Sequence, residues 1–150
     1  MQTLIRPATP DDAAACRAIA RAAYAAYVPL MGRAPAPMLA DYAAHIARDT
    51  VFVLEADDAL LGYAVILDDG GRYWLDNIAV ATGHQGHGLG RRLIEHTEAW
   101  LAARTDRYRL YTNQAMTTND RWYRALGFTE YWRGEVDGYA RIYFEKRLRA

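Results

Sequence analysis

Hydrophobic and polar positions follow two periods along this chain, and together they outline a mixed α/β fold. Residues that favour β-structure, in short runs bounded by turn signals, predict strands at 3–6, 50–55, 60–67, 72–80, 108–113, 128–135 and 139–146. Apolar residues spaced three, four and seven positions apart predict helices at 10–27, 38–48, 89–104 and 118–126. The sequence therefore predicts about seven strands and four helices.

The connections between these elements predict how the strands pair. Short turns at 56–58 and 68–71 join three strands into an antiparallel meander, and Asp137-Gly138 closes a final hairpin. The helix at 89–104 lies between two strands, which implies a right-handed crossover and one parallel pair. We expect a mainly antiparallel central sheet in a single domain spanning 1–150. Residues 24–48, which include a proline-interrupted loop and the helix at 38–48, form a flap beside this sheet.

Composition excludes several classes of function. The chain has 150 residues with 18 Lys and Arg against 18 Asp and Glu, so no basic field attracts nucleic acid or anionic lipid. A single cysteine, Cys16, allows no internal disulfide, in keeping with a reducing compartment. No apolar run reaches the roughly 20 residues of a membrane span. We expect a cytoplasmic protein with no membrane or nucleic-acid partner.

The stretch 74–92, WLDNIAVATGHQGHGLGRR, carries the candidate chemistry. It passes from a strand through a loop with glycine at 83, 86, 88 and 90 into an amphipathic helix. The first N–H groups of such a helix lack partners and point, with the positive end of the helix dipole, toward one spot. Glycine also lets a bulky ligand approach the backbone. The pattern predicts an anion site, and phosphate is the usual anion.

The spacing of the glycines excludes several classes of phosphate-containing ligand. A dinucleotide site needs G-x-G-x-x-G, which is absent, and in a GTPase-type phosphate loop Leu89 would have to be lysine. These mismatches disfavour other nucleotide-binding families. The remaining pattern, Gln85-Gly86-His87-Gly88-Leu89-Gly90, fits [Q/R]-x-x-G-x-[G/A] and resembles the pyrophosphate-binding signature of the GNAT superfamily of acyl-CoA-dependent N-acyltransferases.

A second segment strengthens this resemblance. Residues 111–128, which contain Asn119, Tyr123 and Gly127-Phe128, are similar to the family's N…Y-x-x-x-G-F segment. The predicted order of strands and helices is also similar to the GNAT fold over nearly the whole chain. The resemblance implies acetyl-CoA (coenzyme A) as the cofactor. It implies cofactor contacts at Ile78, Ala79, Val80, Gln85, Gly86, His87, Gly88, Leu89, Gly90, Arg91, Asn119 and Tyr123.

Two residues are candidates for proton transfer. The resemblance implies that Tyr123 is the general acid that protonates the departing thiolate, and the alternative is an aromatic packed beside Trp122 and Phe128. Asp76 is the candidate base, because many family members carry a carboxylate on this strand. By strand alternation it shares a face with Trp74, Ile78 and Val80. Its alternative role is an ion pair or a strand-end hydrogen bond.

The acceptor is expected to enter against the flap. The polar side chains there are Tyr24, Tyr27, Arg33, Tyr42 and His45. Arg33 is a candidate anchor for a carboxylate, with an ordinary surface arginine as the alternative. No histidines or acids have metal-ligand spacing, so we predict no metal.

These inferences lead to one functional hypothesis with alternatives. The chain is expected to be an N-acetyltransferase that moves an acetyl group from acetyl-CoA to a primary amine of a small metabolite, by direct attack in a ternary complex. Acetylation of a protein lysine or N-terminus is one alternative, and a non-catalytic acyl-CoA binding module is another. Dimers are frequent among relatives, so a homodimer is one candidate assembly.

Overall fold

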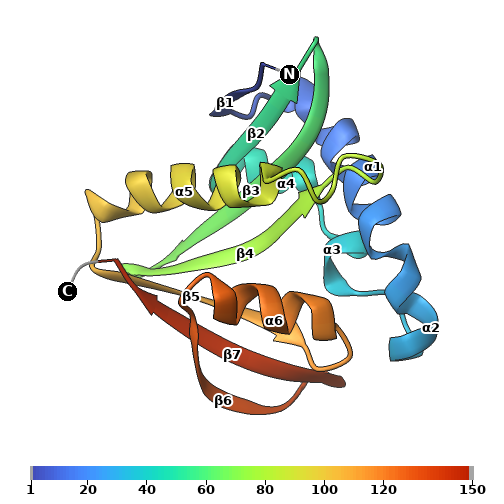
Figure 1. Ribbon diagram of the computed structural model, residues 1–150, viewed down its shortest axis with the longest axis vertical. Helices are drawn as coiled ribbons and strands as arrows, with labels where there is room; N and C mark the ends of the chain where they lie inside the picture. The colour runs from blue at the N-terminus through green and yellow to red at the C-terminus, as the bar shows by residue number, and fades with distance from the viewer. Residues whose placement is uncertain (1, 149–150) are drawn as a thin grey trace.

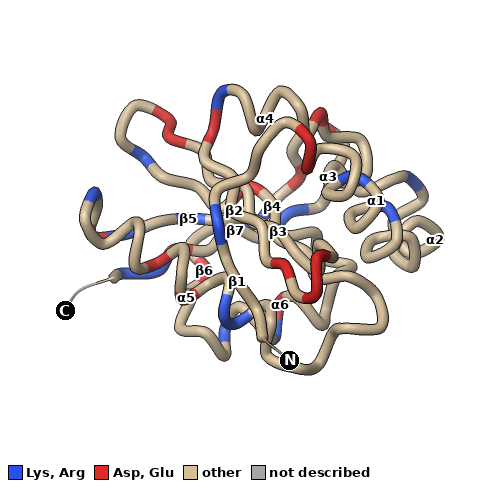
Figure 2. The backbone as a smooth tube through the Cα atoms, turned by 90° about the horizontal axis from the view of Figure 1, so that it is seen from above, with Lys and Arg blue, Asp and Glu red and all other residues tan. Residues whose placement is uncertain are grey.

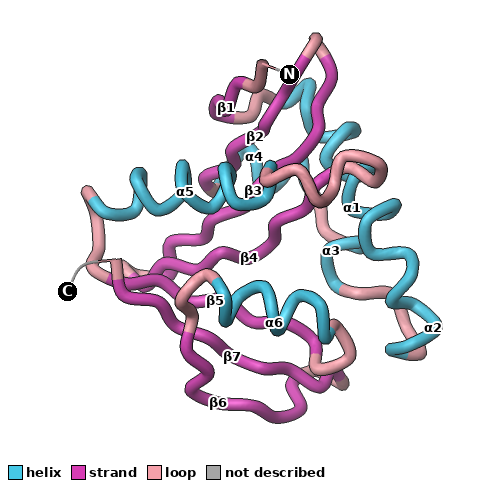
Figure 3. The backbone as a smooth tube through the Cα atoms, viewed as in Figure 1, coloured by secondary structure: helices cyan, strands magenta, loops and turns pink. Residues whose placement is uncertain are grey.

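The computed structural model describes residues 2–148 and contains one seven-stranded sheet with helices on both faces (Figures 1 and 3). The strand order is β1-β2-β3-β4-β5-β7-β6, and every neighbouring pair is antiparallel except β4 and β5. The strands are β1 (Leu4–Pro7), β2 (Thr50–Ala56), β3 (Ala59–Asp69), β4 (Arg72–Val80), β5 (Arg107–Asn113), β6 (Thr129–Val136) and β7 (Tyr139–Arg147). The predicted α/β class and mainly antiparallel sheet are confirmed.

Helices divide the core into two layers. The α-helices are α1 (Ala13–Tyr24), α2 (Val28–Met31), α3 (Ala36–Leu39), α4 (Tyr42–Arg48), α5 (Leu89–Ala102) and α6 (Thr117–Ala125), with 3-10 turns η1 (Pro10–Asp12) and η2 (Ala25–Tyr27). Helices α5 and α6 pack on one face of the sheet through residues such as Leu93 and Tyr123. Helices α1 and α4 pack on the other face, where Cys16 is completely buried.

The flap is more broken than its sequence pattern predicts. The expected helix at 38–48 is two helices, because Ala40 and Asp41 leave the helical region and the Asp41 carboxylate accepts a hydrogen bond from the Ala44 amide at 3.0 Å. Asp41 thus caps a new helix, α4, in place of continuing α3. The chain between α1 and α3 folds into η2 and the single turn of α2, which ends at Gly32.

The sheet opens between β4 and β5. These two strands pair only at Trp74 and Arg109, and then they diverge (Figure 1). The glycine loop follows the far end of β4, and α6 follows β5. The divergence therefore leaves the last residues of β4 without a partner strand on that side, which is where a ligand can reach the backbone.

A β-bulge in β4 changes the predicted face of Asp76. Leu75 pairs with Ile66 and Asn77 pairs with Val65, so Asp76 is an extra residue with no partner on β3. Such an insertion shifts the alternation by one position. Leu75 and Ile78 therefore pack together under α5 and α6, whereas Asp76 lies beside α4. The expectation that Asp76 shares a face with Ile78 and Val80 is wrong for this reason.

Charged residues of both signs are interspersed over the molecule (Figure 2). None of the helices within residues 2–148 combines the length and apolar character that crossing a bilayer requires.

Candidate active site

Two cavities adjoin at the open end of β4. The hairpin-side cavity, about 330 Å³, lies between β4, β5, α3 and the start of β7. The loop-side cavity, about 470 Å³, lies between the end of β4, the glycine loop and the start of α6. Tyr24, Ile78 and Asn119 line both, so the two cavities share a wall at the point where β4 and β5 diverge.

The glycine loop presents free amides to the loop-side cavity. Gly88 caps α5 with a φ of 79°, a conformation that residues with a Cβ rarely adopt. The first helical hydrogen bond runs from the Arg92 amide to the Gly88 carbonyl at 3.1 Å, which leaves the amides of Leu89, Gly90 and Arg91 without a helical acceptor. The Gln85 side chain donates to the Val80 carbonyl at 3.0 Å and ties the loop to β4. These amides and the helix dipole suit an anionic group.

Gly90 packs closely against α6. It has an ordinary helical conformation, but a Cβ there would lie 3.1 Å from the Trp122 ring of α6. The missing side chain lets α6 approach the start of α5. Trp122 thereby becomes a wall of the loop-side cavity.

Two tyrosines frame the junction of the cavities. Tyr24 donates a buried hydrogen bond to the Ile78 carbonyl at 2.9 Å. Tyr123, on α6, lines the hairpin-side cavity and is 6% exposed. Its ring packs on Phe128 and Phe144, and its hydroxyl has no hydrogen-bond partner among the described residues. Burial raises the pKa of Tyr123 well above its ordinary value, so this hydroxyl is protonated at neutral pH.

Asp76 lines the hairpin-side cavity from the bulge in β4. Its Oδ2 lies 3.8 Å from Nε2 of His45, whose Nδ1 lies 2.9 Å from Asp49 Oδ2. Burial raises the pKa of Asp76, and the positive charges of His45 and Arg141 partly oppose that rise. A raised pKa makes the Asp76 carboxylate a better proton acceptor than an ordinary exposed carboxylate.

Comparison with known proteins decides the family. The model of the acetyltransferase (GNAT) domain matches residues 47–130, more than half of the chain. The chain belongs to the GNAT acetyltransferase family. The expected resemblance is confirmed, as are the enzyme class and acetyl-CoA as its cosubstrate.

Solved structures support the fold of this GNAT acetyltransferase. The ribosomal-protein-S18-alanine N-acetyltransferase of Escherichia coli is 22% identical, with a TM-score of 0.80 over 99% of this chain and 96% of that one. The PaiA N-acetyltransferase of Thermoplasma acidophilum in complex with coenzyme A is 17% identical, with a TM-score of 0.82 over 98% and 99%. Nourseothricin acetyltransferase is 21% identical, with a TM-score of 0.74 over 99% of both chains. A search of curated proteins finds no significant match.

Most of the residues predicted to contact the cofactor line one cavity. The loop-side cavity is lined by Ile78, Ala79, Val80, Gln85, Gly86, Gly88, Leu89, Gly90, Arg91 and Asn119. His87 is exposed in the loop and does not line it. Tyr123 lines the hairpin-side cavity instead, at the junction.

The predicted acceptor residues are dispersed. Tyr27 lines the loop-side cavity and Tyr24 lines both. Tyr42 is fully buried and hydrogen-bonded to Tyr63. His45 contacts Asp76 from outside the cavity. Arg33 is exposed, stacks on the Tyr139 ring and donates to the Asp137 carbonyl at 3.1 Å. Arg33, Tyr42 and His45 line neither cavity.

The residues of the hairpin-side cavity that sequence reasoning missed in this acetyltransferase include Tyr111, Tyr139 and Arg141. Tyr111 comes from β5, and Tyr139 and Arg141 come from β7. The two-residue spacing of Tyr139 and Arg141 after a hairpin turn was a usable signal, because it places them on one face of a strand. Which face of β7 lines the cavity depends on the position of β7 between β5 and β6, and the sequence did not reveal that strand order.

Proposed function

We propose that this acetyltransferase, acting as one domain over residues 1–150, transfers the acetyl group of acetyl-CoA to a primary amine of a small metabolite. The reaction would proceed by direct attack within a ternary complex. The observation that carries the proposal is the junction of two cavities at Ile78, with an anion site on one side and Asp76 and Tyr123 on the other.

The glycine loop would hold the diphosphate of the cosubstrate. The amides of Leu89, Gly90 and Arg91 point from the start of α5, and the exposed Arg91 side chain adds a positive charge. Asn119 lies where both cavities meet and would hydrogen-bond the amide groups of the pantetheine arm. This arrangement would bring the thioester to the end of β4.

Asp76 and Tyr123 would carry the two proton transfers. An alkyl ammonium has a pKa of about 10.4 in water, so at neutral pH it must lose a proton before it can attack. Asp76 would accept that proton, directly or through one water. Acetyl-CoA supplies an activated acetyl group on sulfur. As the new C–N bond forms and the C–S bond breaks, the Tyr123 hydroxyl would donate its proton to the leaving sulfur. The nitrogen would lose its second proton, which would return through water to the Tyr123 oxygen.

The walls of the hairpin-side cavity support a small acceptor. Tyr139, from β7, donates a hydrogen bond to the Ala34 carbonyl of the flap at 2.9 Å. Arg33, from the flap, donates in turn to the Asp137 carbonyl of the hairpin. These two contacts join the flap to the hairpin beside the cavity. An extended peptide would have to displace them, whereas a small amine would not.

Thiol release from acetyl-CoA, measured across a library of small amines and lysine-containing or free N-terminal peptides, tests this function. Turnover with small amines supports it, and turnover with peptides alone overturns the choice of acceptor. A thermal shift with acetyl-CoA but not with NAD or ATP tests the cosubstrate separately. Binding of acetyl-CoA without turnover of any amine would indicate a non-catalytic binding module.

A further inference from the structure

Arg141 is a cavity arginine without an acidic partner. Its guanidinium carbon lies 4.2 Å from the centre of the Tyr111 ring and 5.3 Å from that of Tyr139. No carboxylate among the described residues lies within 4.0 Å of it, although other half-buried arginines such as Arg6 and Arg109 are paired at 2.8 and 2.9 Å. Two aromatic rings thus hold a guanidinium whose N–H groups remain available to a ligand.

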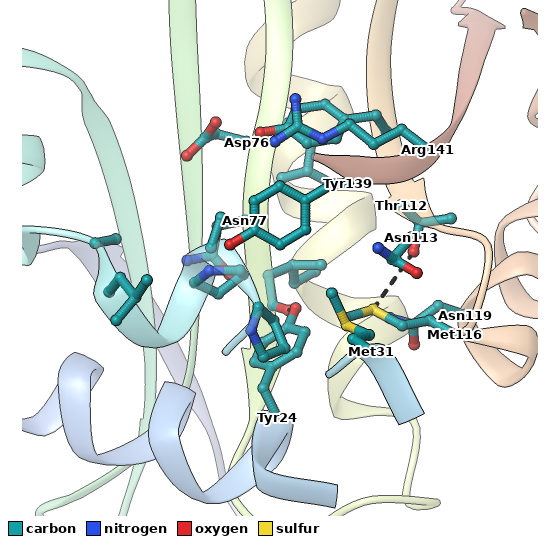
Figure 4. A pocket seen from close by; sticks show the side chains of 18 of the residues that line it. Tyr24, Met31, Asp76, Asn77, Thr112, Asn113, Met116, Asn119, Tyr139 and Arg141 are labelled. Carbon is teal, nitrogen blue, oxygen red and sulfur yellow. Dashed lines mark hydrogen bonds between the residues drawn. The ribbon is translucent and has the colours of Figure 1, made fainter. Parts of the chain in front are cut away.

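The hairpin-side cavity carries one charge of each sign. Among its lining residues, all in the described part of the chain, Asp76 and Arg141 are the charged ones. Figure 4 shows both side chains at the same end of the cavity, beside Tyr139. They are close enough for Arg141 to influence the ionisation of Asp76, yet they do not form an ion pair. The ligand complementary to such a pair carries an ammonium and a carboxylate close together.

We propose that the acceptor of this enzyme is a free α-amino acid, whose carboxylate binds Arg141 and whose amino group faces Asp76. This inference rests on the proposed function and adds the class of acceptor to it. One guanidinium binds a carboxylate through two parallel N–H groups, and the charges of ligand and cavity then cancel. The remaining walls include Met31, Leu39 and Tyr24, which suit an apolar side chain.

Pairs of amines that differ only in the carboxylate test the inference. We would measure kcat/KM for phenylalanine against phenethylamine, methionine against 3-(methylthio)propylamine and tyrosine against tyramine, with acetyl-CoA saturating. The wild type should prefer the amino acid of the best pair by at least tenfold, roughly the effect of one charge-assisted pair. In Arg141→Met this preference should disappear, and in Arg141→Lys it should be partly retained, because lysine keeps the charge but not the planar fork.

Controls separate binding of the carboxylate from folding. Arg141 does not line the loop-side cavity, so the thermal shift of Arg141→Met with acetyl-CoA should equal that of the wild type. Arg147→Met changes an exposed arginine of the same strand and should keep the full preference.

Three outcomes overturn the inference. These are equal rates for the two members of every pair, a preference that survives in Arg141→Met, and turnover of other amines but of no amino acid. In each case the proposed acetyl transfer still stands. If no amine of any kind is acetylated, the proposed function itself fails, and this inference fails with it.

Discussion

Nε2 of His45 lies 3.8 Å from Oδ2 of Asp76, which joins the flap to the bulge in β4. His45 belongs to α4, and its other ring nitrogen contacts Asp49 at the end of the same helix. Because of the bulge, the Asp76 side chain faces α4 and does not pack into the core beneath α5. The candidate base is therefore positioned by a residue that lies outside the cavity.

His45→Gln should move the acid limb of the kcat–pH profile to higher pH. A protonated His45 favours the carboxylate form of Asp76, so its loss should raise the pKa of Asp76 further. Asp49 acts in the opposite sense and Arg141 in the same sense as His45, and both stay in place. The profile is measured with both substrates saturating. His87→Gln, an exposed histidine outside both cavities, should leave the limb unchanged. An unmoved limb in His45→Gln would contradict this coupling.

Asp76→Asn should abolish most of the activity and yet stabilise the fold at pH 7. Burial raises the pKa of Asp76 in the folded state, so its ionised form is less favourable there than in the unfolded chain. Asparagine removes that penalty, and 1 kcal/mol would raise the Tm by about 2–4 °C. The difference should begin to close as the pH falls to the folded pKa, where Asp76 takes up a proton, and should vanish below the unfolded pKa.

Thermal unfolding of both proteins between neutral and acid pH measures this effect. Glu135→Gln, an exposed carboxylate on β6, is the matched control and should change the Tm little. A lower Tm of Asp76→Asn at pH 7 would mean that its contact with His45 outweighs desolvation.

Tyr123→Phe should reduce kcat by roughly a hundredfold with little change in acetyl-CoA affinity. Its ring packs on Phe128 and Phe144, contacts that phenylalanine keeps, and its hydroxyl has no partner among the described residues. The Tm should therefore change little. Steady-state kinetics and a cofactor titration measure the two quantities, with the exposed Tyr131→Phe as control. An unchanged kcat would make Tyr123 a packing residue.

Local patterns predicted the fold well because each depended on neighbouring residues. The turns at 56–58, 68–71 and 137–138 specify antiparallel neighbours, and the glycine loop with its following helix specifies one crossover. The loop-side cavity was predictable for the same reason, since Gly88 and Gly90 act within one strand-loop-helix unit.

The hairpin-side cavity was less predictable because its residues come together only in the tertiary structure. Nothing near Asp76 in the sequence indicates the bulge that changes its face, since the register depends on pairing with β3. In the sequence, Arg141 is an ordinary arginine of a strand. Only the pairing of β7 with β5 in the tertiary structure places it in the cavity. Arg33, the arginine that the sequence favoured as an anchor, instead packs on the outside of Tyr139.

Gly88→Ala should weaken acetyl-CoA binding about tenfold more than Gly71→Ala does. Gly88 has a φ of 79° and Gly71, in the turn between β3 and β4, has a φ of 90°; a Cβ at either position meets no atom within 4 Å. Both alanine variants should therefore lose about 1–2 kcal/mol from backbone strain alone. Only Gly88 lies on the loop-side cavity, where strain would also misplace the amides at the start of α5. Thermal unfolding should thus give similar losses for the two variants, while a titration with acetyl-CoA should separate them. Equal affinities in the two variants would show that the geometry of this helix start does not determine how the cosubstrate binds.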